Sequence, residues 1–198
     1  AFVQIGNGGY SANYGGRNTT GHSGEIMVQA ADDIRLHGGS FDNNSVQIGH
    51  GGRGSQGWHG YQADQLDPAR PDYAAIDADG KGNITITAGG IFEVLAGRGV
   101  SFSDNEQYAQ VGHGGYDADG NHQGNIRVTS GTGEISTTTG VIGGSGQMGG
   151  VVFTAGQTRD ASVQLGDGGF GARSSRADGD SGVRGLIGNI TVTTTGDV

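Results

Sequence analysis

Apolar and polar residues alternate over short stretches, and the same stretches recur four times along the chain. Alternation with period two predicts a β-strand with one buried face, and the glycine cluster that ends each stretch predicts a turn. Units of this kind bury their apolar residues by stacking on one another, so the pattern predicts a repeat protein. The four copies are Val3–Gly9, Val46–Gly52, Ala109–Gly115 and Val163–Gly169, and Gln4, Gln47, Gln110 and Gln164 mark them.

A second strand-like segment follows each copy. A glycine and a polar residue lead into an apolar, polar, apolar triplet, and we expect the triplets to lie side by side in a parallel stack. They are residues 26–28, 84–86, 126–128 and 190–192. A weaker third segment comes eight or nine residues later, at 34–36, 92–94 and 135–137. We predict a core formed by Ile5, Ile48, Val111 and Leu165 from the first segments and Ile26, Ile84, Ile126 and Ile190 from the second.

The spacing between copies varies at one place. The intervals between successive repeated glutamines are unequal, and most of the difference lies between the glycine cluster and the second segment. Insertions should therefore emerge as unequal loops on one side of the stack. Each copy holds at least three strands, so we expect about two coils per copy, seven to nine in all, and a rod of about 35 to 45 Å.

Composition supports a solenoid and excludes several other classes. The chain has 44 Gly, 2 Pro, no Cys, 32% hydrophobic residues and a formal charge of −9 in 198 residues. A single compact core, a collagen helix and plain disorder all fit poorly, and no apolar run is long enough to span a bilayer. The negative charge and the single lysine argue against nucleic acid and anionic membranes as partners. Without cysteine, stability must come from the stacked strands.

The recurring phrases resemble the repeat regions of large bacterial surface proteins of the filamentous-haemagglutinin type. The similarity rests on the alternation of the first segments with Gly-Asn-Ile-Thr-Ile-Thr and on the fragments Ala88-Gly89-Gly90 and Thr154-Ala155-Gly156. The resemblance implies an all-β, right-handed parallel β-helix spanning residues 1–198, secreted or held at the cell surface, that serves as an adhesin stalk or filament. A carbohydrate-binding or carbohydrate-active β-helix is the alternative.

Two kinds of residue suggest metal sites. Asp77, Asp79, Asp117 and Asp119 place carboxylates at alternate positions of glycine-bearing turns, which suits calcium, although these residues are also common in ordinary turns. His50 and His113 occupy the same place in two copies, where the other copies have Asn7 and Asp167. We expect intervening coils to hold the histidines too far apart to share zinc, and predict polar turn residues. The repeated glutamines should face outward and hydrogen-bond to one another along the stack.

The longest insertion, between Gly52 and Gly82, is the predicted recognition surface. It carries Trp58, His59, Tyr61 and Tyr73, and loop aromatics on a rigid scaffold stack on sugars or anchor protein partners. Pinning of the loop to the wall explains Trp58 equally well. Asp64, Asp67 and Asp72 lie in the same loop without a base beside them, so we predict no catalytic residue and no enzyme activity.

Both ends of the sequence fall within a repeat. Residues 1–4 align with 44–47, and residues 196–198 resemble the start of a third segment. We therefore expect open strand edges at both ends, which either adjoining repeats of a longer chain or other copies of this chain would cover.

Overall fold

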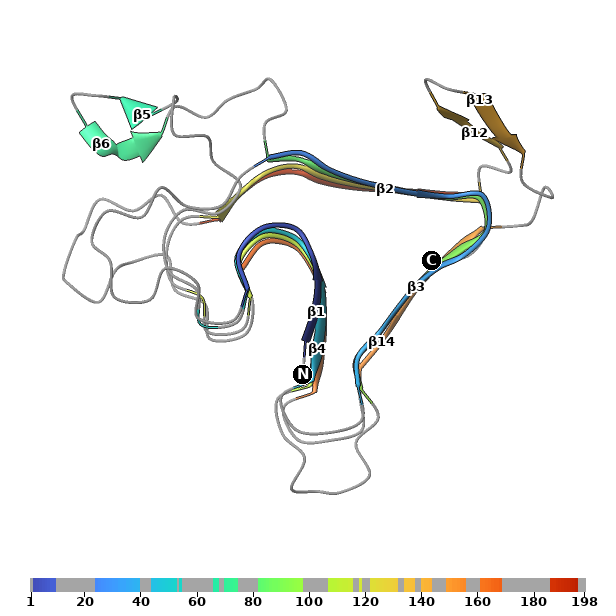
Figure 1. Ribbon diagram of the computed structural model, residues 1–198, viewed down its shortest axis with the longest axis horizontal. Helices are drawn as coiled ribbons and strands as arrows, with labels where there is room; N and C mark the ends of the chain where they lie inside the picture. Colours follow the sequence, from blue (N-terminus) through green and yellow to red (C-terminus); the bar gives the residue numbers. More distant parts are fainter. Residues whose placement is uncertain are drawn as a thin grey trace.

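The described part of the protein is all-β, and most of its strands run parallel in three sheets. The computed structural model describes residues 2–9, 24–39, 44–52, 54, 66–67, 70–74, 82–97, 107–115, 118, 122–131, 134–137, 140–143, 149–155, 161–168 and 186–195. Figure 1, which looks along the stack, shows strands of different repeats lying over one another. The architecture is compatible with a β-solenoid. We refer to residues 2–39, 44–97, 107–155 and 161–195 as repeats 1 to 4.

Each repeat contributes one strand to each sheet, except that the third sheet has described strands from repeats 1 to 3 only. The first sheet consists of β1 (Phe2–Ile5), β4 (Ser45–Ile48), β9 (Tyr108–Val111) and β15 (Ser162–Leu165). The second consists of β2 (Ile26–Ala30), β7 (Ile84–Ala88), β11 (Ile126–Ser130) and β17 (Ile190–Thr194). The third consists of β3 (Ile34–His37), β8 (Ile91–Leu95) and β14 (Gly150–Thr154).

One repeat forms one layer of the stack, so the prediction of two coils per repeat was wrong. Gln4 pairs in register with Gln47, Gln47 with Gln110, and Gln110 with Gln164. Equivalent residues are therefore direct neighbours. Four layers span three strand spacings, about 14 Å, rather than the 35 to 45 Å expected. The long intervals in the sequence lie within layers and add nothing to the height of the stack.

The second sheet confirms the predicted parallel wall. Its strands pair in parallel from Ile26 through Ile84 and Ile126 to Ile190, and alternate residues point into the core. Ile84, Ile126 and Ile26 are 0%, 1% and 6% exposed. Ile190 is 50% exposed and Ile5 47%, so the prediction that these two are buried was wrong. Both belong to outermost layers, where no further described layer covers them.

Two antiparallel hairpins extend from the stack, as Figure 1 shows. One consists of β5 (Leu66–Asp67) and β6 (Arg70–Ala74), within the longest predicted insertion. The other consists of β12 (Glu134–Thr137) and β13 (Gly140–Gly143). Residues 135–137, predicted as the third segment of their repeat, thus belong to a hairpin. Val151 and Phe153 of β14 pair with β8 in the third sheet instead. Insertions therefore occur at two places in the repeat. A short parallel pair, β10 (His122–Gln123) with β16 (Leu186–Ile187), completes the described strands.

A glycine-rich arch follows each strand of the first sheet and turns the chain over the glutamine-bearing face. The arches are residues 6–9, 49–52, 112–115 and 166–168, which lie over one another in Figure 1. Their close stacking requires glycine. A Cβ on Gly112 (φ +152°) would lie 1.9 Å from the carbonyl oxygen of Gly166, and one on Gly49 (φ +155°) would lie 1.8 Å from that of Gly112.

Candidate functional site

The most distinctive polar site is the interface between successive layers beneath the arches. Gln47 and Gln110 are 3% and 1% exposed, so the prediction that the repeated glutamines face outward was wrong. The alternating pattern correctly places the glutamines on the face of the sheet that their apolar neighbours do not occupy. The arch covers this face as well, so neither face of the first sheet is open to solvent in the inner repeats.

The glutamines bind the arch of the next layer rather than one another. Gln4 Nε2 donates to the carbonyl oxygen of Gly49 at 2.8 Å, and Gln47 Nε2 donates to those of Gly112 and Gly114 at 3.0 and 2.8 Å. Gln110 Nε2 donates to Gly166 O at 3.2 Å. Each amide thereby satisfies carbonyls that the arch buries.

In repeat 4, no arch of a following layer lies beside the glutamine among the described residues. Gln164 Nε2 instead donates to carbonyls of its own arch, at Gly166, Asp167 and Gly168. The same side chain that joins layers elsewhere is therefore turned back on its own repeat.

A second column of contacts uses the residue after the first arch glycine. The backbone N–H of Asn7 donates to Nδ1 of His50 at 2.9 Å, that of His50 to Nδ1 of His113 at 3.1 Å, and that of His113 to Oδ1 of Asp167 at 2.7 Å. The acceptor always belongs to the following layer. Histidine and aspartate are interchangeable here because each places an acceptor atom at the same point.

The two histidines lie side by side, so the prediction that intervening coils separate them was wrong. Their rings stack with centroids 5.1 Å apart and planes 3° from parallel. Nδ1 of each accepts from a backbone N–H, while Nε2 of His50 lies 2.8 Å from the carbonyl oxygen of Gly24 and Nε2 of His113 faces that of Gly82. A carbonyl can only accept, so these partners assign the proton to Nε2 and both rings are neutral.

This arrangement leaves no lone pair on either ring for a metal. Within the described ranges, no cluster of three or more histidine, cysteine, aspartate or glutamate side chains is placed to hold an ion. The histidines instead tie the arch of one layer to the start of the second-sheet strand in the layer before it. They therefore connect the arches of the first sheet to the second sheet.

Among the described residues, Asp167 is the ionisable group whose pKa departs most clearly from its ordinary value. Burial raises the pKa of this carboxyl to about 7, and the hydrogen bond from the His113 N–H offsets part of that rise. Near neutral pH the side chain is therefore divided between its charged and neutral forms.

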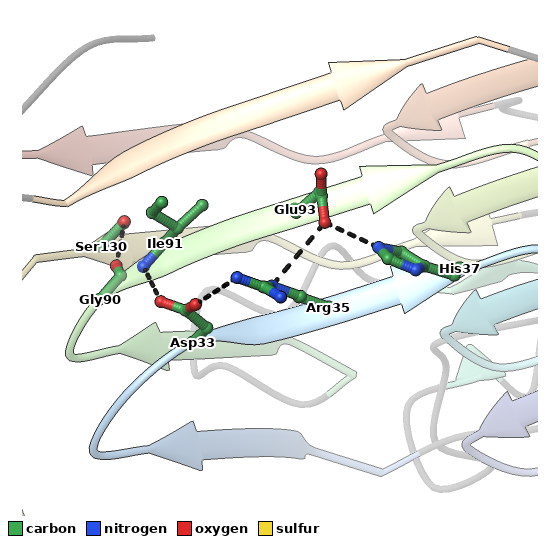
Figure 2. A network of polar contacts seen from close by, with 7 residues as sticks. All are labelled: Asp33, Arg35, His37, Gly90, Ile91, Glu93 and Ser130. Atoms are coloured by element: carbon green, nitrogen blue, oxygen red, sulfur yellow. Dashed lines mark hydrogen bonds and ion pairs between the residues drawn. The ribbon is translucent and has the colours of Figure 1, made fainter.

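A charged cluster lies on the outer face of the third sheet (Figure 2). Nη2 of Arg35 lies 2.7 Å from Oδ2 of Asp33, and Nε2 of His37 lies 2.7 Å from Oε2 of Glu93, which is also 3.8 Å from Arg35 Nε. Asp33 Oδ1 accepts from the backbone N–H of Ile91 at 2.8 Å. Arg35 and His37 are 56% and 47% exposed, so each pair contributes little to stability. The cluster joins repeats 1 and 2 from outside, and its charges face one another.

Most of the binding and metal residues predicted from sequence lie outside the described residues. These are Trp58, His59 and Tyr61 of the aromatic loop and Asp77, Asp79, Asp117 and Asp119 of the calcium prediction. Tyr73 belongs to β6. Both predictions therefore stay untested.

Sequence reasoning missed the interlayer contacts, although a signal for them was present. Asn7, His50, His113 and Asp167 differ in charge and size, but each side chain offers a hydrogen-bond acceptor close to the backbone. That shared property, at one position in all four copies, indicates a structural hydrogen bond.

Comparison with known proteins gives no match, since no family model, curated protein or solved structure shows significant similarity to the chain. Within the described ranges, no helical segment has the length and hydrophobicity that a membrane span requires.

Proposed function

We propose that this chain is a segment of an extracellular stalk or filament, folded as a right-handed parallel β-solenoid in which each repeat adds one coil. The observation that carries the proposal is the identity of its three interlayer interfaces. Each uses the same strand register, and in each a strand glutamine and a backbone N–H of the arch donate to acceptors of the next layer. Because every interface uses the same contacts, further repeats can be added to the stack in the same way.

The uneven repeat lengths fit the same role. The residues that bind adjacent layers keep their register, although the intervals between the repeated glutamines differ from copy to copy. Insertions therefore leave the stack unchanged and are free to vary, as in solenoids whose loops carry recognition. Placement at the cell surface rests on the sequence resemblance. The interlayer hydrogen bonds need no disulfide and suit an extracellular chain that lacks cysteine.

Insertion of whole repeats tests the proposal. One, two or three extra copies of residues 4–46, placed after Val46, preserve the Val-Gln junction of the repeat. Each copy should lengthen the particle by about 4.8 Å along the stack without widening it, as measured by small-angle X-ray scattering. Each should also raise the midpoint of thermal unfolding, because it adds one repeat and one interface.

A control insertion of the same residues carries Gly6→Val in each inserted copy, because a Cβ at this glycine would lie 2.2 Å from the carbonyl oxygen of Gly49 in the next layer. It should not extend a folded stack. Extra copies that unfold, or that pack beside the existing layers and thicken the particle, would contradict the stalk proposal. The alternative predicted from sequence, a carbohydrate-binding or carbohydrate-active β-helix, depends on the aromatic loop and predicts glycan binding that is lost in Trp58→Ala.

A further inference from the structure

The two outermost layers present complementary halves of the interface that joins the inner ones. In repeat 4, the edges of β15 and β17 are not paired with a further described strand, and in repeat 1 the same holds for β1 and β2. Large apolar side chains are exposed at both ends. Ile190 is 50% exposed at one end, and Phe2, Val3 and Ile5 are 47%, 65% and 47% exposed at the other.

The first sheet supplies one set of matching groups. If the internal register continued from repeat 4 to a following repeat 1, β15 would pair with β1 and Gln164 would lie beside Gln4, as Gln110 lies beside Gln164. The Gln164 amide would then reach the carbonyls of Gly6 and Gly8, the counterparts of those that Gln47 binds. The Asp167 N–H would face the Asn7 side chain, whose amide oxygen is an acceptor.

The second sheet supplies another set. At each internal interface, the N–H of the first strand residue donates to the preceding carbonyl of the next layer, as Ile126 does to Asn189 at 2.9 Å. In the reverse direction, the N–H of Asn189 donates to Oδ1 of Asn125 at 2.9 Å. Continued stacking would set the Ile190 N–H against the Glu25 carbonyl and the Glu25 N–H against Oδ1 of Asn189. Donors thus meet acceptors in both sheets.

From these matches we infer that a second copy of this chain docks on the open face of repeat 4 through its own repeat 1, in the register of the internal interfaces. The inference rests on the proposed stacking function and names its partner. The contact joins different surfaces of the two copies and leaves one of each open, so it propagates into a linear filament. Covering Phe2, Val3 and Ile190 removes apolar surface from water and drives the association.

Two variants block opposite ends. A Cβ at residue 166 would meet the Gly6 carbonyl of the docked copy, because a Cβ on Gly112 lies 1.9 Å from Gly166 O in the equivalent internal contact. Among the described residues of its own chain, the same Cβ has no neighbour closer than 3.5 Å, so we expect Gly166→Ala to leave the monomer folded, with some strain at φ +142°. Val3→Lys places a charge on the opposite end, at a side chain that is 65% exposed.

Sedimentation velocity over a concentration series tests the docking. The natural chain should form dimers and longer species as its concentration rises, while Gly166→Ala and Val3→Lys should each weaken association by at least about tenfold. Mixed together, the two variants should form one-to-one dimers that grow no further, because each retains the end that the other lacks. Arg127→Thr, on the outward face of β11 in an inner layer, should associate like the natural chain.

Cysteine cross-linking tests the register, since the chain has no cysteine of its own. Chains carrying Thr191→Cys and Met27→Cys should form a disulfide-linked dimer. Within one chain, Arg127 lies opposite Thr191, and Thr85 lies opposite Met27. The same register between two chains would place Thr191 opposite Met27, on strands about 4.8 Å apart. With Gln29→Cys in place of Met27→Cys, the Cα atoms would be about 8 Å apart and no link should form.

A chain that stays monomeric, or variants that fail to complement each other, would overturn the inference. The open faces would then serve adjoining repeats of one longer polypeptide. Such a result would leave the stalk proposal standing if inserted repeats still lengthen the particle. Cross-linking of both cysteine pairs alike would show association without the proposed register and would equally overturn it.

Discussion

At the scale of single residues, the repeat keeps a hydrogen-bonding role and varies the residue that performs it. Asn7, His50, His113 and Asp167 share one position, and in three of the four repeats this side chain accepts from the preceding layer. Since only an acceptor atom is required, the histidines need no catalytic or metal role to explain them. The stack tolerates an ionisable side chain at this position, but the free energy of unfolding then depends on pH.

Asp167→Asn should show how much the charge of this carboxylate reduces stability. The pKa of Asp167 is about 7 in the folded protein against 3.8 for an ordinary aspartate, so the folded state holds a proton that the unfolded chain releases between these values. Stability from this group is therefore present at about pH 4 and is lost as the pH rises to 7. Asparagine keeps the acceptor for the His113 N–H and has no charge. The variant should be more stable at pH 8 by about 1 kcal/mol, after allowance for solvent screening.

Urea denaturation of both proteins at pH 4, 6 and 8 measures this difference. The gap between them should close toward pH 4, where Asp167 is protonated in the folded state. Asn7→Asp introduces the reverse change in repeat 1, where the side chain is exposed, and serves as a control that should show a smaller pH dependence. An Asp167→Asn variant that is less stable at pH 8 would contradict burial of a charged carboxylate.

The calcium prediction also belongs to single residues. If Asp77, Asp79, Asp117 and Asp119 hold calcium, a chelator should lower the melting temperature and added calcium should restore it. The quadruple replacement by asparagine should lose this response while magnesium has little effect on either protein. An unchanged transition in chelator would leave these aspartates as turn residues.

At the scale of elements, the arch depends on how closely its glycines stack. Gly112→Ala and Gly166→Ala put the same side chain at similar backbone angles, φ +152° and +142°. In the first, the new Cβ would lie 1.9 Å from a carbonyl oxygen of the next layer, and in the second its nearest neighbour among the described residues is 3.5 Å away. Gly112→Ala should therefore cost at least about 3 kcal/mol, and Gly166→Ala about 1 kcal/mol.

Chemical denaturation at low protein concentration, where the chain is monomeric, gives both values. The difference between the two variants measures the interlayer contact alone, because backbone strain is common to both. Equal losses of stability would mean that the arches separate without cost and that strain alone fixes these glycines.

The elements also show what the sequence could and could not predict. The first and second strands of every repeat, their parallel arrangement and the inward position of Ile84, Ile126 and Val111 follow from the alternating pattern. Burial of Gln47 does not follow from it, because alternation says which side a residue faces but not whether that side is covered. The hairpin β12–β13 was missed because a short strand with period two reads alike in a parallel layer and in an antiparallel pair.

At the scale of the whole molecule, the number of coils per repeat was the main error of prediction. A long repeat with three strands suggests two coils, whereas the same glutamine in every copy indicates one contact per copy. Direct adjacency of the copies changes every inference that depends on distance. It brings the histidine rings together, makes the stack short, and makes each layer a unit that can be removed.

Removal of residues 47–109 is the corresponding prediction for the whole molecule. The deletion takes out one complete repeat, joins Val46 to Gln110 and sets repeat 1 directly against repeat 3. Gln4 would then reach the carbonyls of Gly112 and Gly114, and the Asn7 N–H would reach Nδ1 of His113, as their counterparts in repeat 2 do. Because layers contact only their neighbours, the rest of the chain should still fold.

The shortened chain should keep its β-rich circular dichroism and a cooperative urea transition. Its melting temperature and m-value should both fall, because one interface and the area that it buries are lost. Removal of residues 47–110 is the matched control, since it also takes out Gln110 and leaves Val46 in the glutamine's position, where no amide can donate to the carbonyl oxygen of Gly166. If the in-register deletion is as unfolded as this control, stability resides in the stack as a whole, and independent addition of layers fails as a description of this protein.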